Sequence, residues 1–174
     1  MQIDRIEETR LTADVETQIA KLMERSFPTD FVGRSYFHQR HHTRLVVRAP
    51  HIIGQIALTF RAIRLGNDLI DIIGLAEVGT DPDHRGKGIA AALLQAAIAE
   101  ARVSLASHML LFGEAKLYAA AGFRPVQNKM RYVVITKART LRTQTAKADG
   151  LMVLPLRDIP WPDGADIDML GHVF

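Results

Sequence analysis

A basic, glycine-rich loop just before a helix-like segment carries the clearest chemistry in the sequence. Arg85 is followed by Gly86-Lys87-Gly88, and an alanine-rich segment with helical spacing begins at Ile89. The first backbone N–H groups of a helix have no partner within the helix, and the helix dipole places partial positive charge there. Glycines let an anion approach the backbone closely, and the two cations add charge. The loop therefore predicts a phosphate-binding site.

Two well-known phosphate loops fit these residues less well. A Walker loop has four residues between its glycines, followed by Lys and then Ser or Thr. Here Gly79 and Gly86 are too far apart, and Gly88 follows the lysine. A relaxed dinucleotide fingerprint matches Gly86-x-Gly88-x-x-Ala91, but its first glycine belongs at the end of a parallel strand, and here a five-residue loop intervenes. A dinucleotide such as NADH stays open as the alternative ligand.

The elements that must position this loop form an α/β (α+β-like) pattern. Gly66-Asn67-Asp68 predicts the turn of an antiparallel hairpin, and Gly122 predicts a left-handed helix cap. We expect a central, mixed and mostly antiparallel sheet flanked by helices. Apolar spacing predicts helices over 15–27, 89–103 and 114–121, and strands over 44–49, 52–65, 69–80, 107–112, 123–135 and 151–156.

The composition is that of one globular domain over residues 1–174. The chain has 174 residues, of which 48% are hydrophobic and 24% charged. The absence of cysteine excludes disulfides, thiolate zinc sites and a thiol nucleophile. The opening residues are polar and no apolar run is long enough to span a bilayer, so we expect a cytoplasmic protein without a membrane partner.

Charge is unevenly distributed along the second half of the chain. Residues 124–148 hold cations and no acid, and residues 158–174 hold acids and no Lys or Arg. The basic segment is typical of a solvated strand edge. A nucleic-acid partner is not expected, because aromatic residues other than Tyr132 are missing between the cations.

The acidic C-terminal segment either lines an acceptor site or is a solvated tail with Trp161 in the core. Its candidate lining residues are Trp161, Asp166, Asp168, His172 and Phe174.

The loop and its flanks resemble the GNAT superfamily of acyl-CoA-dependent N-acyltransferases. Arg85-x-x-Gly88-x-Ala90 resembles the Q/R-x-x-G-x-G/A loop of that superfamily, and residues 78–85 resemble the strand and loop before it. Downstream, residues 115–123 resemble its helix-to-strand element, so the resemblance covers most of 15–132. More faintly, residues 150–155 with Trp161-Pro162-x-Gly164 resemble aminoglycoside acetyltransferases acting on the two-prime amine, and nodulation acyltransferases.

The resemblance implies a GNAT fold that uses acetyl-CoA and a small-molecule amine, such as an amino sugar or an aminoglycoside-like acceptor. It implies direct attack in a ternary complex, since no cysteine exists for a covalent relay, and by analogy a homodimer. Pantetheine would pair with Val78, Gly79 and Thr80, and an N–H near Val78 would face the thioester oxygen, an interaction worth about 3 kcal/mol. The pyrophosphate would lie on the backbone of Arg85, Gly86, Lys87, Gly88, Ile89, Ala90 and Ala91.

Two residues are candidates for moving protons. Tyr118 suits the general acid that protonates the leaving thiolate, or else it packs on its helix. Many members of the family have a glutamate that acts as the general base on the strand before the loop. The matching position here is Ala76, and the glutamate of this chain is the next residue, Glu77. One step along a strand changes faces, so a bulge is needed to turn Glu77 toward the substrate. His84 is the alternative base.

The cluster of histidines within residues 38–42 invites a metal interpretation. A third ligand and a glutamate base at the usual spacing are missing, so we expect no metal and instead a polar segment near the substrate.

Two further functions remain open. One is transfer of a longer acyl group from a carrier protein docked on the basic segment that begins at Arg124, and the other is non-catalytic sensing of acyl-CoA.

Overall fold

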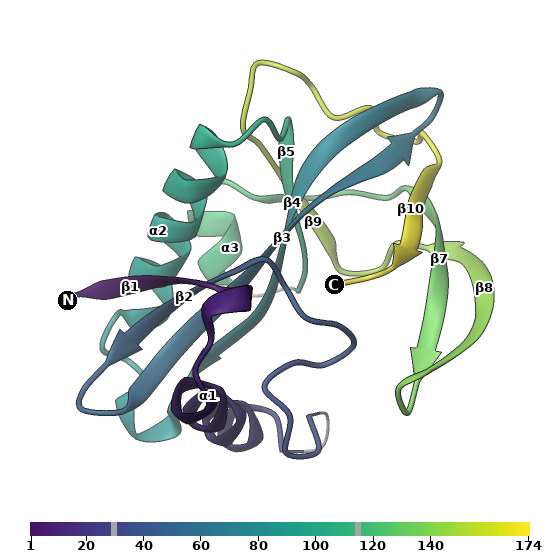
Figure 1. The fold of residues 1–174 in the computed structure, drawn as a ribbon. Helices are drawn as coiled ribbons and strands as arrows, with labels where there is room; N and C mark the ends of the chain where they lie inside the picture. Colours follow the sequence, from purple (N-terminus) through teal and green to yellow (C-terminus); the bar gives the residue numbers. More distant parts are fainter. Residues whose placement is uncertain (29–30, 114–115) are drawn as a thin grey trace. The chain divides into compact units, whose positions relative to one another are not determined.

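The structure is a computed structural model that describes residues 1–28, 31–113 and 116–174. It confirms the expected α/β class, with a mixed, mostly antiparallel sheet and flanking helices (Figure 1). The chain divides into two compact units. The first comprises Met1–Thr59 and Leu75–Glu100, and the second comprises Phe60–Gly74 and Ala101–Phe174. Strands β3 (Ile52–Leu65) and β4 (Asp68–Thr80) each contribute residues to both units.

The first unit joins antiparallel strands to two helices. Strand β1 pairs with β2, and β2 pairs with the first half of β3, both antiparallel. The described elements, besides its parts of β3 and β4, are β1 (Ile3–Glu7), η1 (Glu8–Arg10), α1 (Ala13–Ser26), β2 (Thr43–Arg48), η2 (Pro82–His84) and most of α2 (Ile89–Val103).

Helices α1 and α2 cover opposite faces of the first unit's sheet. Val46 of β2 lies opposite Gln55 of β3, whose Nε2 is 3.2 Å from the Met23 sulfur of α1. Gly54 directly precedes Gln55 in β3, and neighbouring residues of a strand face opposite sides of the sheet. A Cβ atom at Gly54 would lie 2.5 Å from Cγ2 of Ile89 in α2. The absence of a side chain at Gly54 therefore lets the start of α2 rest directly on the sheet.

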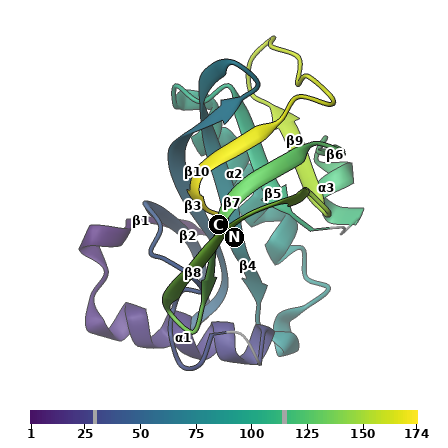
Figure 2. The same ribbon diagram turned by 90° about the vertical axis from the view of Figure 1, so that its right-hand side faces the viewer.

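The second unit holds the rest of the sheet. Its strand order is β6-β9-β5-β4-β3-β10-β7-β8, in which β4 with β5 and β10 with β7 are the parallel pairs. Strand β10 runs beside β7, and β8 returns along the other edge of β7 (Figure 2). The elements are β5 (His108–Phe112), α3 (Lys116–Ala120), β6 (Arg124–Pro125), β7 (Lys129–Thr136), β8 (Arg139–Lys147), β9 (Leu151–Pro155) and β10 (Ile167–His172).

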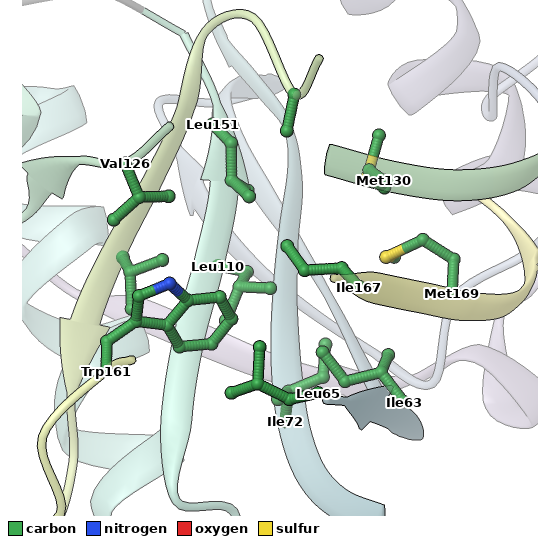
Figure 3. Close-up of a cluster of buried hydrophobic side chains, with 12 residues drawn as sticks. Ile63, Leu65, Ile72, Leu110, Val126, Met130, Leu151, Trp161, Ile167 and Met169 are labelled. Carbon is green, nitrogen blue, oxygen red and sulfur yellow. The ribbon is translucent and has the colours of Figure 1, made fainter. Parts of the chain in front are cut away.

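Trp161 lies in the hydrophobic core of the second unit. Its side chain packs among aliphatic residues such as Leu110 and Val126 (Figure 3), and the residue is 3% exposed. The indole Nε1–H donates to Oδ1 of Asn128 at 2.9 Å. Of the two interpretations that the sequence allowed for Trp161, the structure shows the one in which the ring is buried.

Several predicted boundaries were wrong. The single strand expected over 123–135 is two strands, because the N–H of Val126 donates to the Leu151 carbonyl and the chain then leaves β9 to pair with β10 and β8. Strands β1, β8 and β10 were not predicted at all. Most residues of β8 are solvent-exposed and it carries no apolar alternation, so it has no period-two signal. The predicted helix start at Glu114 and Ala115 lies outside the described residues.

Within the described ranges, no helix combines the length and the apolar character needed to cross a membrane.

Candidate functional site

The predicted phosphate loop leads directly into the start of α2. The N–H of Ala92 donates to the Gly88 carbonyl at 3.0 Å, which makes Gly88 the residue that precedes the first helical turn. Gly86 and Gly88 both have φ of +76°, a conformation that favours glycine. A Cβ at either position would meet no described atom within 4 Å. These glycines are therefore needed for backbone shape, and they border open space that a ligand can enter.

The charges of the loop are available on its surface. Arg85 and Lys87 are exposed, and the Lys87 ammonium donates a long hydrogen bond of 3.4 Å to the Asp83 carbonyl. Ile89 is buried against the sheet, whereas Ala91 is exposed. The seven residues from Arg85 to Ala91 thus combine unpaired helix-start N–H groups, left-handed glycines and cations, which is the arrangement that binds a phosphate.

Asp81 fixes the loop that precedes these residues. It accepts a hydrogen bond of 2.5 Å from Arg25 of α1 and one of 2.9 Å from the N–H of Asp83. Burial acts to raise the pKa of Asp81, but the Asp83 N–H, His84 and Arg25 together hold it below its usual value. The His84 ring lies 3.5 Å from Asp81 Oδ1, so His84 is part of this brace.

The end of β4 contains the other predicted cofactor residues. Val78 and Thr80 are half-buried, and Gly79 is buried because its missing side chain leaves room for Met23 of α1. The hydroxyl of Thr80 is buried and has no hydrogen-bond partner among the described residues. An orphaned hydroxyl on the strand that leads to the phosphate loop is a position where a ligand atom would supply the missing partner.

Glu77 has the backbone irregularity that its predicted role requires. Its φ is +53°, the left-handed region that non-glycine residues rarely adopt, at a cost of about 1–3 kcal/mol. This kink breaks the regular alternation of β4. The Glu77 side chain points into the first unit and is 5% exposed.

Both carboxylate oxygens of Glu77 have partners. Oε1 accepts from the N–H of Phe37 at 2.7 Å and lies 2.9 Å from Nε2 of His41. Oε2 accepts from Arg44 at 3.2 Å and from the amide of Gln55 at 3.5 Å. Glu77 is therefore held by four partners within a buried polar cluster.

Arg44 of β2 is the residue that sequence reasoning missed. It is fully buried and donates to both oxygens of Glu8, at 2.7 and 3.1 Å, as well as to Glu77. Its remaining hydrogen bonds reach the Ser35 carbonyl and Gln55. The sequence shows only that Arg44 and Arg48 flank the apolar run of β2, and the structure shows that Arg44 is the buried one of the two.

Tyr118, the predicted general acid, lies on α3 in the second unit. Burial raises the pKa of its phenol, which keeps the hydroxyl protonated at neutral pH. Its ring meets Phe123 edge-on, with centroids 6.2 Å apart. The phosphate loop and Glu77 belong to the first unit, so the role of Tyr118 stays a prediction.

The histidine cluster and the C-terminal segment have structural partners. The Nδ1 atom of His41 lies 2.9 Å from the Thr59 hydroxyl, and the described part of the chain holds no group of three metal-ligating side chains. Residues of the acidic C-terminal segment form β10, an interior strand whose Met169 and His172 carbonyls accept from Arg61. This segment is therefore not a solvated tail.

Comparisons with solved structures agree on the fold. A GNAT family N-acetyltransferase from Escherichia coli, solved with CoA, aligns over 96% of this chain and 88% of its own at a TM-score of 0.64 and 16% identity. A GNAT family acetyltransferase from Brucella melitensis, solved with acetyl-CoA, aligns over 95% and 94% at 0.59 and 16%. The ribosomal-protein-S18-alanine N-acetyltransferase from Escherichia coli aligns over 91% and 97% at 0.59 and 16%.

A family comparison addresses the sequence itself. No curated protein matches the chain significantly. The family model described as "Acetyltransferase (GNAT) domain" matches residues 9–126, which is more than half of the chain and includes both the phosphate loop and Glu77. This chain belongs to the GNAT acetyltransferase family.

Proposed function

We propose that this protein transfers an acetyl group from acetyl-CoA to the primary amine of a small molecule, by direct attack in a ternary complex. The observation that carries the proposal is the backbone anion site at the start of α2. There, two left-handed glycines, Gly86 and Gly88, border open space and alternate with the exposed Arg85 and Lys87. The two GNAT structures solved with CoA and acetyl-CoA support the choice of this donor.

The residues of the first unit fit a CoA ester. Backbone N–H groups from Arg85 to Ala91 would hold the pyrophosphate, and Val78, Gly79 and Thr80 would run along the pantetheine arm. The unpartnered hydroxyl of Thr80 supports this placement. When bound, acetyl-CoA supplies the acetyl group as a thioester.

The protein's own groups would supply polarisation and proton transfer. The N–H near Val78 would donate to the thioester oxygen, a contact worth about 3 kcal/mol. Tyr118 would protonate the leaving sulfur, since a phenol carries its proton at neutral pH. Glu77, in the buried polar cluster, would take part in removing the proton of the amine.

The acceptor is proposed only as a small primary amine, with amino sugars and aminoglycosides as the first candidates. Trp161 gives no support for an aromatic wall in the acceptor site, because its ring is buried in the core of the second unit.

Calorimetric titration tests the donor. We expect acetyl-CoA and CoA to bind the wild-type protein, NADH not to bind, and Gly88→Trp to lose binding because the indole fills the space beside the backbone. Gly164→Trp is the matched control, since Gly164 also has a positive φ, of +88°, and open surroundings. Absence of CoA binding overturns the proposal, and binding of NADH in its place favours the dinucleotide interpretation.

Thiol release from acetyl-CoA then tests the reaction over a panel that includes glucosamine, kanamycin and spermidine. Turnover with any of these amines supports the transferase. Tight CoA binding without turnover over a broad panel would instead indicate an acyl-CoA sensor.

A further inference from the structure

We propose that Thr59, His41 and Glu77 form a proton relay in which the acceptor's proton enters at the Thr59 hydroxyl and is stored on His41. This inference rests on the proposed function and adds a proton-storage group to it. All three residues belong to the first unit. They come from β3, from the segment before β2, and from the kink in β4.

The three side chains lie in a line of short contacts. Thr59 Oγ1 is 2.9 Å from His41 Nδ1, and His41 Nε2 is 2.9 Å from Glu77 Oε1. Nε2 makes no hydrogen bond of good geometry, so its contact with Glu77 is mainly electrostatic. The lone pairs of an imidazole nitrogen and a carboxylate oxygen repel at this distance unless the nitrogen carries a proton.

The partners of Glu77 determine which nitrogen of His41 carries that proton. Glu77 already accepts from Arg44 and from the N–H of Phe37, so the tautomer that fits this contact carries its proton on His41 Nε2. In the neutral ring Nδ1 is then the free acceptor, and it faces the Thr59 hydroxyl. The line therefore has a hydroxyl donor, an imidazole acceptor and a carboxylate that orients the ring, the same three roles as in a hydrolase triad.

Exposure indicates where a proton enters. The side chains of His41 and Glu77 are each 5% exposed, whereas Thr59 is half-buried on β3. Thr59 is thus the member of the line that an amine or a water molecule can reach.

The ionisable side chains around His41 include more carboxylates than guanidinium groups. The facing ionisable groups are Glu8 of η1, Glu16 of α1, Arg40 of the segment before β2, Arg44 of β2 and Glu77 of β4. These three carboxylates and two guanidinium groups together carry one formal negative charge. Transfer of a proton to His41 balances the formal charges of these side chains.

The transfer balances without any other reactant. One N–H bond of the acceptor's ammonium breaks as Thr59 Oγ1 takes the proton, and the original Thr59 O–H bond breaks as its proton passes to His41 Nδ1. The amine is left with the lone pair that attacks, and His41 becomes an imidazolium paired with Glu77. Imidazole is by nature a stronger base than a carboxylate that already accepts from Arg44 and Phe37. His41 and Glu77 act through Thr59 and are therefore positioning residues.

The kinetic test compares Thr59→Val with Thr59→Ser, using the panel amine with the highest turnover and acetyl-CoA. We expect Thr59→Val to lower turnover at pH 7 by about 100-fold, the scale of general-base catalysis. The deficit should shrink toward pH 10, where the amine loses its proton unaided. Thr59→Ser should restore turnover to within about threefold, and acetyl-CoA affinity should stay within about twofold in both variants.

Two histidine variants complete the set. His41→Gln should show the same pH-dependent loss as Thr59→Val, and His42→Gln, an exposed neighbour, should stay within about twofold of wild type. A Thr59→Val enzyme within threefold of wild type across pH 6–9 overturns the relay. So does a loss that does not depend on pH.

Nitrogen-15 NMR of the imidazoles gives a readout that needs no turnover. Assigned through His41→Gln, the wild-type His41 ring should be protonated at Nε2, and Glu77→Gln should shift it toward the other tautomer. A wild-type ring protonated at Nδ1 overturns the inference. If acetyl-CoA fails to bind, the proposed function falls, and the NMR result still decides whether the line exists.

Discussion

Replacing Arg44 by methionine should be among the most damaging single changes in the first unit. Arg44 is fully buried and donates to Glu8 at 2.7 and 3.1 Å and to Glu77 at 3.2 Å. The Glu8 and Glu77 side chains are 6% and 5% exposed, so neither carboxylate can recover these interactions from water. Removing one partner of a buried ion pair costs about 3–5 kcal/mol. The whole stability of a domain is about 5–15 kcal/mol.

Thermal and denaturant unfolding measure this cost. At about 2–4 °C per kcal/mol for a chain of this size, Arg44→Met should lower the Tm by roughly 6–20 °C. Adding Glu8→Gln should recover part of the loss, because one stranded charge is removed. Arg40→Met is the control: Arg40 pairs with Glu8 and Glu16 but is 48% exposed, so its removal should cost at most about 1 kcal/mol. An Arg44→Met protein destabilised by less than 1 kcal/mol would refute the reasoning that Arg44 compensates the buried carboxylates of Glu8 and Glu77.

Three further perturbations probe other parts of the chain. Burial lowers the pKa of His108 in the folded protein. Above pH about 6.5 the histidine is neutral in both the folded and the unfolded chain, so it does not reduce the free energy of unfolding. Below that pH the unfolded chain binds the proton first, and the free energy of unfolding declines. His108→Gln should flatten that decline in urea unfolding between pH 5 and 7, and an unchanged slope would contradict it. Asn128→Ala should cost about 1–3 kcal/mol in guanidinium unfolding, because it removes the partner of the Trp161 indole N–H and the amide hydrogen bonds to the Pro162 and Ala165 carbonyls; a neutral change would contradict this cost. Gly54→Ala should cost about 1–3 kcal/mol and weaken acetyl-CoA binding in calorimetry, since its Cβ would push Ile89 at the start of α2; unchanged affinity would show that the helix start can shift freely.

Elements with a strong local pattern were predicted well. Strand β3 and helix α2 have the predicted bounds, Ile52–Leu65 and Ile89–Val103, because long apolar runs are bounded there by turn residues and glycines. Strand β8 was missed because it is an exposed edge strand without an apolar face. Strand β10 was missed because its place depends on β3 and β7, which lie far away in sequence.

The same distinction applies to the site. The phosphate loop depends on neighbouring residues and a helix start, so its residues could be chosen from the sequence. The contact between Glu8 and Arg44 joins residues 36 apart, and that between Arg44 and Glu77 joins residues 33 apart. The left-handed conformation of Glu77 has no local signal, since glycine and asparagine are the residues that usually announce it.

The position of β10 has a consequence for how the nascent chain folds. It pairs with both β3 and β7, and its Met169 carbonyl accepts from Arg61, 108 residues earlier in the chain. On the ribosome, β3 and the β7–β8 hairpin are therefore complete long before the strand that separates them emerges. Until then β3 and β7 each expose an unpaired edge, which is a site where another chain can pair. The second unit can close its sheet only after Ile167–His172 has been synthesised, so we expect its folding to lag behind the synthesis of β3.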